Sequence, residues 1–351
     1  MSTIASLLTS CPDTQVGLYT AFDKYAGTYE PLPQLEWLNS EINNSAIKGL
    51  ITRPQGKLIN VDVTYFRRRT ESQLLTNQSN PVCSGGELDP DTTTTYQLDS
   101  SVNIQDIELT TIDDLERHCQ SNPQYFADLI ARLADNVERG VATKSATESA
   151  ALIGKWASNV TVDGSDNLVV ATKYADGTQD PSFIGDIRLA TMKTGYVGGA
   201  INFADSLLYR AYMDALVGCC SDSGINVAET LAAYGVATMY DYRVEAAMAA
   251  AKVANTSMLT QNGAMTLLYH TRSGWTDGMP MDWKIGGNYA FRTIIGRTGT
   301  PMDLTISDNC GAVTIAVTAT TKVVGLPQDM YKSGDRLEGV TGVNSVLVTN
   351  P

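Results

Sequence analysis

The chain has 351 residues, and 25 Lys and Arg residues against 38 Asp and Glu residues give it a net charge of −13. This acidic balance argues against a basic reader of nucleic acid, because binding to phosphate needs a surplus of Lys and Arg. Only 18% of the residues are charged, while 43% are hydrophobic. Such a composition suits large, weakly charged contact surfaces better than a highly charged monomer.

The sequence offers little for catalysis. Its two histidines, His118 and His270, argue against a Ser-His-Asp triad and a multi-histidine metal site. The six cysteines include no CxxC pair, so we expect reduced thiols rather than a disulfide framework. No apolar run reaches the ~20 residues of a membrane span, and the absence of a basic residue before Lys24 argues against a secretory signal. We therefore predict no catalytic, cofactor or metal site.

Residues 1–56 contain prolines between short apolar pieces. Apolar residues at helical spacing predict one short helix over residues 35–47. The rest of this segment is interpreted as an extended arm with little core of its own, which would be tied to a neighbouring molecule.

Residues 58–66 alternate between apolar and polar side chains, and alternation resumes from Thr94 to about Leu109. The long polar stretch between these strands predicts an extended β-hairpin with its tip at residues 70–93. The Arg67-Arg68-Arg69 cluster that ends the first strand is interpreted as an ion-pairing surface rather than a nucleic-acid site.

Two helix starts follow the hairpin. Thr111 with Asp114 resembles a capping box that opens a short helix ending near Cys119. Asn122 followed by Pro123 is a stronger start signal. The residues that follow it predict one long helix reaching as far as Ile153, because they include an apolar stripe at helical spacing: Phe126, Ile130, Leu133, Val137 and Val141.

The remaining chain mixes helices and strands, so the fold class is α+β. Residues 159–162 and 168–172 are predicted to form a β-hairpin. Helices are expected from Ile201 toward Cys219 and over residues 227–233, whereas residues 239–248 suit either a strand or a helix. Strands are predicted at 265–269, 291–295, 302–306, 313–317, 322–326 and 346–348.

Three further motifs favour structural interpretations. The glycines at 195, 198 and 199 lack the spacing of a phosphate loop, so a turn before a packed helix is the better interpretation. His118-Cys119 has no second ligand pair at metal-binding spacing. Asp241 and Glu245 are expected to face solvent rather than act as paired acids.

The order of arm, long hairpin, long amphipathic helix, mixed centre and returning strands resembles the major capsid fold of tailed bacteriophages, which encapsulins share. Residues 258–269 and 325–342 also resemble segments of phage virion proteins. The resemblance implies an N-terminal arm at 1–56, an extended hairpin loop at 57–110, a peripheral domain with a spine helix at 111–200, an axial domain at 201–300 and returning strands at 301–351.

The same resemblance implies a major capsid protein that self-assembles into pentamers and hexamers of an icosahedral shell around double-stranded DNA. It would need no cofactor, enclose DNA without sequence-specific binding, avoid membranes, and assemble in the host cytoplasm to end in the virion. Scaffolding, portal or decoration proteins would be its further partners. Inter-subunit contacts are expected at Arg67, Arg68, Arg69, Leu74 and Leu75.

Two alternatives stay open. A tail-tube or baseplate component would also use a long hairpin and many Thr-rich strands. A ligand-binding protein or enzyme would carry a buried, ligand-sized pocket with convergent polar groups.

Overall fold

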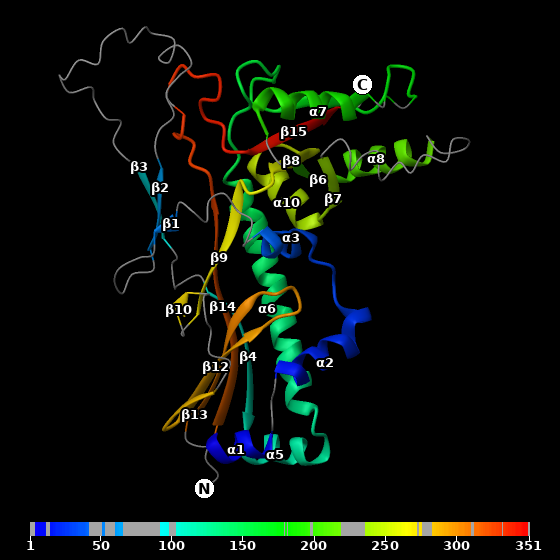
Figure 1. Cartoon of the computed structure of the whole chain (residues 1–351). Coiled ribbons are helices and arrows are strands. Elements are labelled where there is room, and N and C mark those ends of the chain that lie inside the picture. The colour runs from blue at the N-terminus through cyan, green and yellow to red at the C-terminus, as the bar shows by residue number, and fades with distance from the viewer. Residues whose placement is uncertain are drawn as a thin grey trace, which may run out of the picture. The chain divides into compact units, whose positions relative to one another are not determined.

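The chain folds into two compact units, each formed from three separate stretches of sequence (Figure 1). Unit 1 comprises Met1–Asn39, Leu98–Ser145 and Leu267–Lys322, and unit 2 comprises Ser40–Gln97, Ala146–Thr266 and Val323–Pro351. The computed structural model describes residues 4–11, 15–41, 51–52, 60–65, 92–97, 103–178, 180, 182–196, 199–218, 236–271, 274–275, 283–309, 312–331 and 333–349.

Unit 1 is organised around a seven-stranded sheet, whose order is β10-β9-β14-β13-β12-β11, with β4 paired to β14 as well. Residues 312–318 of β14 therefore lie between β13 on one side and β4 on the other. The strands are β4 (Ile104–Thr111), β9 (Met265–Thr271), β10 (Gly274–Trp275), β11 (Lys284–Gly286), β12 (Tyr289–Ile295), β13 (Pro301–Asn309) and β14 (Ala312–Gly325).

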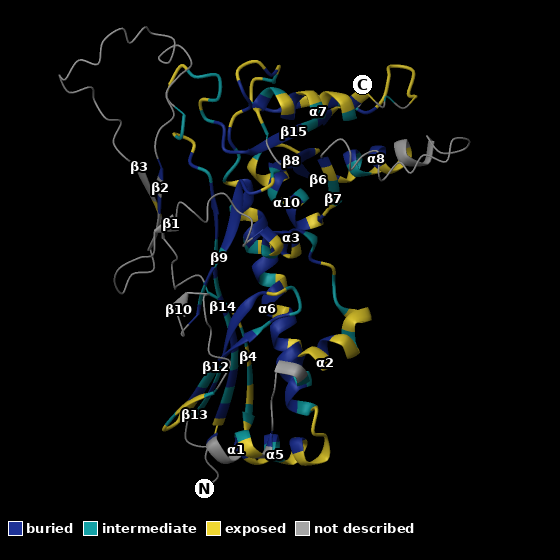
Figure 2. Cartoon of the chain, viewed as in Figure 1, coloured by how far each residue is buried: buried dark blue, intermediate teal, exposed yellow. Residues whose placement is uncertain are grey.

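One face of this sheet forms the core of unit 1. In β14 the side chains of Val313, Ile315, Val317 and Ala319 are fully buried, while the residues between them are partly exposed, as strand alternation requires. The long helix α6 (Tyr125–Ala150) contributes its expected stripe to the core, and Figure 2 shows a continuous buried side along it. The whole stripe that the sequence predicted is buried: Phe126, Ile130, Leu133, Val137 and Val141.

Both predicted helix starts are confirmed. Thr111 caps α5 (Ile112–Ser121), because its hydroxyl accepts a hydrogen bond from the Asp114 amide. Asn122 accepts one from the Gln124 amide ahead of α6. The long helix ends at Ala150, close to the expected limit.

The N-terminal segment differs from the expectation of an extended arm with one short helix. Two additional helices precede the expected one, and Ile4, Leu7 and Leu18 on them are at most 2% exposed. The sequence analysis missed these helices because both are short and the prolines around them suggested an extended segment: α1 ends just before Pro12, and α2 lies between Pro12 and Pro31. The helices are α1 (Ile4–Ser10), α2 (Gln15–Tyr25), the 3₁₀ turn η1 (Ala26–Thr28) and α3 (Pro33–Glu41).

The expectation of reduced cysteines is wrong for one pair. Cys11 and Cys119 form a disulfide across 108 residues, because α1 packs against α5 and brings the two Cα atoms to 5.3 Å. Scattered cysteines without a motif gave no sign of this pairing, since it depends on tertiary contact. Cys219 and Cys220 lie outside the described residues.

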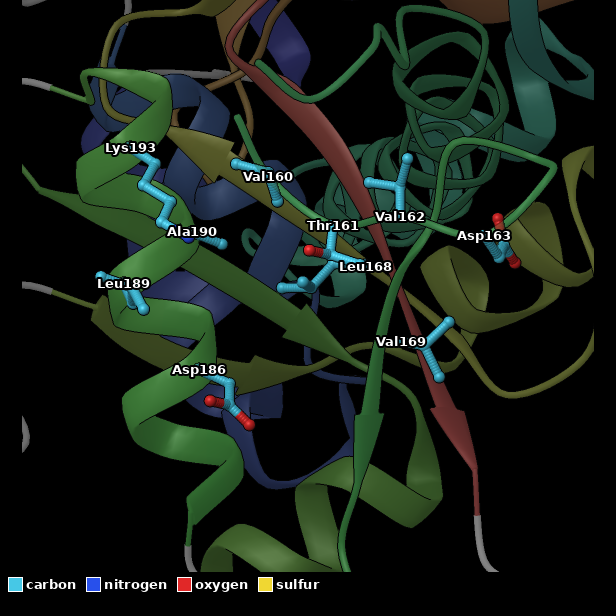
Figure 3. Close-up of a pocket in the computed structure, with 10 residues that line it drawn as sticks. All are labelled: Val160, Thr161, Val162, Asp163, Leu168, Val169, Asp186, Leu189, Ala190 and Lys193. Carbon is cyan, nitrogen blue, oxygen red and sulfur yellow. The ribbon is translucent and has the colours of Figure 1, made fainter. Parts of the chain in front are cut away.

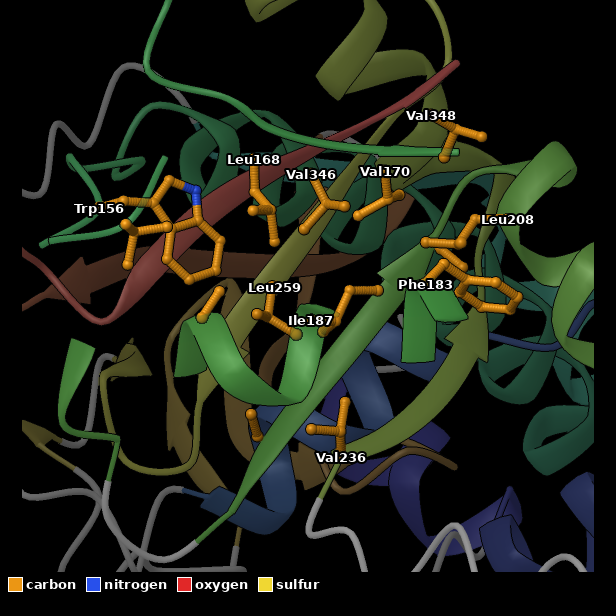
Figure 4. Packing of buried hydrophobic residues seen from close by; sticks show 14 of the residues in the cluster. Trp156, Leu168, Val170, Phe183, Ile187, Leu208, Val236, Leu259, Val346 and Val348 are labelled. Carbon is orange, nitrogen blue, oxygen red and sulfur yellow. The ribbon is translucent and has the colours of Figure 1, made fainter. Parts of the chain in front are cut away.

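Unit 2 is built on a five-stranded sheet of order β5-β15-β8-β6-β7. Helices α7 and α8 cover one face, where Phe183, Ile187 and Leu208 join the core (Figure 4). Helix α10 contacts β8 and β6. The elements are β5 (Leu168–Ala171), α7 (Ser182–Thr194), β6 (Ala200–Ala204), α8 (Ser206–Gly218), β7 (Val236–Tyr240), α10 (Tyr242–Ala251), β8 (Thr256–Gln261) and β15 (Val343–Thr349).

Several predictions in unit 2 are wrong. Residues 159–162 form no strand, and β5 pairs with β15 in parallel instead. The helix expected from Ile201 begins later, because residues 201–204 belong to strand β6. Asp205 separates this strand from α8 and caps the helix by accepting a hydrogen bond from the Leu208 amide. Residues 239–248, which suited either a strand or a helix, contain the end of β7 and the start of α10. Helix α7 and strand β8 were not predicted. The expected helix at 227–233 lies outside the described residues.

The predicted hairpin strands do pair. A small sheet of order β1-β2-β3 contains β1 (Ile51–Thr52), β2 (Asn60–Tyr65) and β3 (Thr92–Gln97). Tyr65 is buried and its hydroxyl donates to Asp329, which anchors β2 within unit 2. The expected single strand from Thr94 to Leu109 is two strands in different sheets, β3 and β4. The hairpin tip falls largely outside the described residues.

Candidate assembly surfaces

The residues proposed from the sequence for inter-subunit contact all lie outside the described part of the chain. The polar residues weighed for catalysis have structural positions. His118 stacks on Tyr125 with 4.7 Å between ring centroids, Asp241 caps α10, and Glu245 accepts from the Ser206 hydroxyl at 2.8 Å. Among the described residues, no cluster of three or more metal-ligating side chains is present, and no helix there is long and apolar enough to cross a membrane.

Strand β4 turns Ile107 and Leu109, two of its three apolar side chains, outward. Glu108 pairs with Arg132 of α6 at 2.5 Å, and Asp106 accepts from Asn136 at 2.8 Å, so the carboxylates face the helix. On the opposite side of the strand, Ile107 and Leu109 are 44% and 72% exposed. A strand with one solvated face usually places its polar residues outward. The reversed pattern makes this side of β4 a candidate contact surface.

The exposed side chains of β4 belong to two uncharged rows that cross four strands. In one row, Ile107 is paired with Ala316, Ala316 with Thr305 and Thr305 with Phe291. The next strand, β11, adds Lys284, whose ammonium lies over the Phe291 ring at 5.6 Å from its centroid. In the other row, Leu109 is paired with Thr314, Thr314 with Ser307 and Ser307 with Tyr289. The ring of Tyr289 stacks on that of Phe291, with 6.4 Å between the centroids. We call these rows the outer sheet face: Ile107, Leu109, Tyr289, Phe291, Thr305, Ser307, Thr314 and Ala316.

A hollow of about 290 Å³ lies at the β5 edge of the sheet in unit 2 (Figure 3). Its walls come from β5, α7 and the loop before β5. Leu189 and Val169 on its rim are 51% and 43% exposed, and Asp186 and Lys193 stand two helical turns apart along α7. Asp163 in the loop accepts from Asn167 and Ser165, and these bonds hold the pKa of its carboxyl below the usual value. We call this region the β5-edge hollow: Val160, Thr161, Val162, Asp163, Leu168, Val169, Asp186, Leu189, Ala190 and Lys193.

The other edge of the same sheet carries an aromatic patch. Tyr209 of α8 and Tyr240 of β7 lie with their ring centroids 5.6 Å apart. Tyr240 is 37% exposed and its hydroxyl donates to Glu245 at 2.9 Å. Exposed tyrosine and methionine are enriched in protein interfaces. We call this region the β7-edge patch: Tyr209, Arg210, Met213, Asp214 and Tyr240.

A buried polar cluster fixes the turn between β12 and β13 to α6 inside unit 1. Arg297 donates to Asp135 at 3.0 Å and to the Glu30 carbonyl at 2.6 Å, and lies over the Tyr29 ring. Burial raises the pKa of Glu138 to about 7, although the Thr298 hydrogen bonds and Arg297 act against that shift. Burial and the nearby Asp135 charge raise the pKa of Tyr29 to about 12. Arg297 pairs with both Asp135 and Glu138, while one oxygen of Glu138 has no hydrogen bond among the described residues, and the cluster suits a structural support.

A second hollow of about 610 Å³ is lined by α2, η1, α6 and β4. Its charged residues already pair with one another, as in Lys24 with Asp128 at 2.6 Å and Arg132 with Glu108 at 2.5 Å. The charged groups that line this hollow are solvated and already form ion pairs. They do not make the dry pocket with convergent polar groups that a small-molecule site needs.

The sequence contained a signal for the outer sheet face that was not recognised. Polar and apolar residues alternate over residues 106–110, but alternation alone does not say which side of a strand faces the core. Contacts with α6 decide which side of β4 faces inward, because Arg132 and Asn136 hydrogen-bond to the carboxylates of Glu108 and Asp106. The β5 and β7 edges could not be found from the sequence, because two of the elements that form them were not predicted as they occur.

No family model matches the chain, and no curated protein matches it either. Among solved structures, it is similar to one described as the cyanophage A-1(L) capsid asymmetric unit, with 10% identity over 85% of this chain and 91% of that chain, at a TM-score of 0.48. It is also similar to a virus-like particle from Pyrococcus furiosus, with 10% identity, 91% and 99% coverage and a TM-score of 0.36. A third is the satellite phage P4 procapsid including size determination (Sid) protein, with 9% identity, 94% and 97% coverage and a TM-score of 0.39. The printed descriptions are thus of a phage capsid, a virus-like particle and a phage procapsid.

Proposed function

We propose that this protein is a major capsid protein, which self-assembles into the pentamers and hexamers of an icosahedral shell that encloses double-stranded DNA. The observation that carries the proposal is the outer sheet face, where Leu109 is 72% exposed and the carboxylates of β4 point inward. Two uncharged rows across four strands are costly to leave in water and gain free energy when another protein surface covers them, at about 25 cal/mol per Å² of apolar area.

Further features support a shell subunit. The chain pairs a β-hairpin with a long helix and a long returning strand, which is the order that led to the capsid resemblance. Its net charge of −13 suits a container that holds DNA without adhering to it. Many moderate contacts, each repeated by symmetry, would make the stability of the particle collective.

Electron microscopy of the purified protein tests this proposal directly. Closed shells of uniform diameter are expected, with pentameric and hexameric clusters on their surface. Helical tubes of uniform width would instead support the tail-tube or baseplate alternative. A protein that stays monomeric at high concentration would contradict both.

DNA enclosure has its own test. Particles recovered from the cells in which the phage grows should protect double-stranded DNA from nuclease until they are opened by heat. The isolated subunit, in contrast, should not shift a DNA probe in a gel at physiological salt, because its surface has no net positive charge.

A further inference from the structure

Two short helices of unit 1 bury apolar stripes of the same spacing, and each stripe ends in a cysteine. In both stripes the second and third side chains follow the first by three and by seven residues, which places them on one helix face. The Cys11 amide donates to the Leu7 carbonyl at 2.8 Å, so this cysteine continues the spacing of α1 beyond its end at Ser10. The stripe of α1 is Ile4, Leu7 and Cys11, and that of α5 is Ile112, Leu115 and Cys119.

Packing of α1 against α5 brings the two cysteines together. Their Cα atoms are 5.3 Å apart, a separation that suits a disulfide. The same site also suits two thiols, because a free cysteine packs as a small apolar side chain. The Cys11 sulfur lies 3.8 Å from the Leu115 carbonyl oxygen, which can accept the weak hydrogen bond of a thiol. Unit 1 can therefore fold around this pair before any bond forms.

Burial shields the pair from reagents in solution. Cys11 and Cys119 are 0% and 3% exposed, whereas thiol–disulfide exchange requires a thiolate to reach a sulfur atom. Cys119 also lies in the last turn of α5, where the negative end of a helix opposes a thiolate. The bond can then be neither made nor broken by direct attack on the packed structure. Both steps need the two helices to separate first.

Of the two helices, α1 is the one that can leave. Helix α5 follows β4 directly and is itself followed by α6, and both of these elements belong to the core of unit 1 (Figure 1). Helix α1 has only seven residues, fewer than the ~12–15 at which an isolated helix becomes marginally stable in water. Its position therefore depends on packing against α5 and β13. Segments held in this way open locally while the rest of a unit stays folded.

We propose that Cys11 and Cys119 form a redox lock on α1, which closes and opens only while α1 is transiently detached from α5. In a reducing pool both thiols are free and packing alone holds α1. In an oxidising pool the Cys11 thiolate attacks glutathione disulfide and releases one glutathione, and the Cys119 thiolate then attacks the mixed disulfide and releases the second. The cysteines lose two electrons and two protons, which end on the two glutathione thiols. This lock concerns unit 1 alone and is independent of the proposed function.

Hydrogen exchange of the full chain, followed by mass spectrometry, tests the lock directly. Amides of residues 4–11 should exchange at least tenfold faster in the reduced protein than in the oxidised one, because a bonded α1 cannot separate from α5. Amides of residues 126–141 in α6 should exchange equally in both. The Cys11→Ser variant should behave as the reduced wild type, with or without reductant. Equal exchange of α1 in the two redox states, or equal loosening of α1 and α6, would overturn the lock.

Reduction kinetics provide a second readout. Oxidised protein is mixed with reduced glutathione and quenched with iodoacetamide, and alkylation of the peptides that contain Cys11 and Cys119 is measured over time. Native reduction should be at least 100-fold slower than reduction in denaturant. Leu7→Ala loosens α1 and should speed native reduction at least tenfold, whereas Leu35→Ala, at an equally buried leucine of α3, should not. Equal acceleration by both variants would show that unfolding of the whole unit exposes the bond, and thiols that stay free in glutathione disulfide would also overturn the lock.

Discussion

Thr298 donates two hydrogen bonds to the same oxygen of Glu138, from its backbone amide at 3.0 Å and from its hydroxyl at 2.6 Å. The other carboxylate oxygen lies 3.7 Å from Arg297 Nε and has no hydrogen bond among the described residues. One side chain from the middle of α6 thus organises the turn between β12 and β13, at the cost of burying a carboxyl group that is only half satisfied.

The titration of Glu138 gives unit 1 a specific pH dependence. Burial raises the pKa of Glu138 in the folded state from 4.5 to about 7. Between pH 4.5 and pH 7, the folded state therefore keeps a proton on this carboxyl group that the unfolded state has lost. The contribution of this group to stability is complete below pH 4.5 and is lost as pH rises through 7, with a total of about 3 kcal/mol. Denaturant unfolding at pH 5 and pH 8 should show this loss in the wild type and not in Glu138→Gln. Asp23→Asn, at an exposed carboxylate of α2, should behave as the wild type, and an unchanged pH dependence in Glu138→Gln would contradict the assignment.

Gly296 must lack a side chain because Glu138 occupies the space beside it. A Cβ at this position would lie 2.2 Å from Glu138 Oε1 and 2.7 Å from the Met302 terminal methyl. Gly296→Ala should therefore destabilise the protein by about 1–3 kcal/mol through overpacking of a fixed turn. Gly287→Ala is the matched control, since a Cβ there meets nothing within 4 Å, and it should be neutral or slightly stabilising. Equal melting temperatures of the two variants would refute this account.

The outer sheet face should matter for assembly and not for folding. Leu109→Thr removes an apolar side chain that is 72% exposed, so the unfolding free energy of the subunit should change by less than about 0.5 kcal/mol. Particle yield, measured by sucrose gradient, should fall strongly. Leu304→Ala on the buried side of the same sheet should do the reverse and cost about 2–5 kcal/mol of stability. Normal particle yield from Leu109→Thr would remove the main support for the proposed function.

The Cys11–Cys119 disulfide should stabilise unit 1 in proportion to the long loop that it closes. For a loop of 108 residues the loss of unfolded-state entropy corresponds to about 4–5 kcal/mol, and measured values are commonly about 2–4 kcal/mol. Reductant should lower the unfolding free energy of the wild type by that amount. It should leave the Cys11→Ser variant unchanged, which separates the effect of the bridge from general effects of the reductant. A wild type that unfolds equally with and without reductant would show that the bridge contributes nothing.

Local signals predicted the local parts of this fold well. The hydroxyl of Thr111, the amide of Asn122 and the stripe from Phe126 to Val141 lie within a few residues of the groups they contact, so capping and periodicity were sufficient. Errors arose where distant partners decide the structure. Residues 201–204 form a strand because β7 and β8 pair on either side of them, which no short window reveals.

The candidate surfaces also divide into parts that local sequence patterns indicate and parts that depend on distant contacts. Apolar residues such as Ile107 and Leu109 were recognisable as one face of a strand, yet the contacts of Asp106 and Glu108 with α6 decide that this face is outward. The edges of the five-stranded sheet depend on a parallel pair, β5 with β15, that joins residues 168–171 to 346–349. Such a pairing gives no nearby sequence pattern that could have predicted it.

The covalent bond between α1 and α5 also changes what a break in the chain would do. Everything from Cys11 to Cys119 is part of one closed ring, which includes the strands of the hairpin. A single proteolytic cut anywhere within that ring would leave both fragments attached to the same molecule. On a gel run without reductant the nicked protein would keep its full mass, and only added thiol would release an N-terminal piece. Proteolytic cuts can therefore accumulate in this segment without the molecule losing its N-terminal helices.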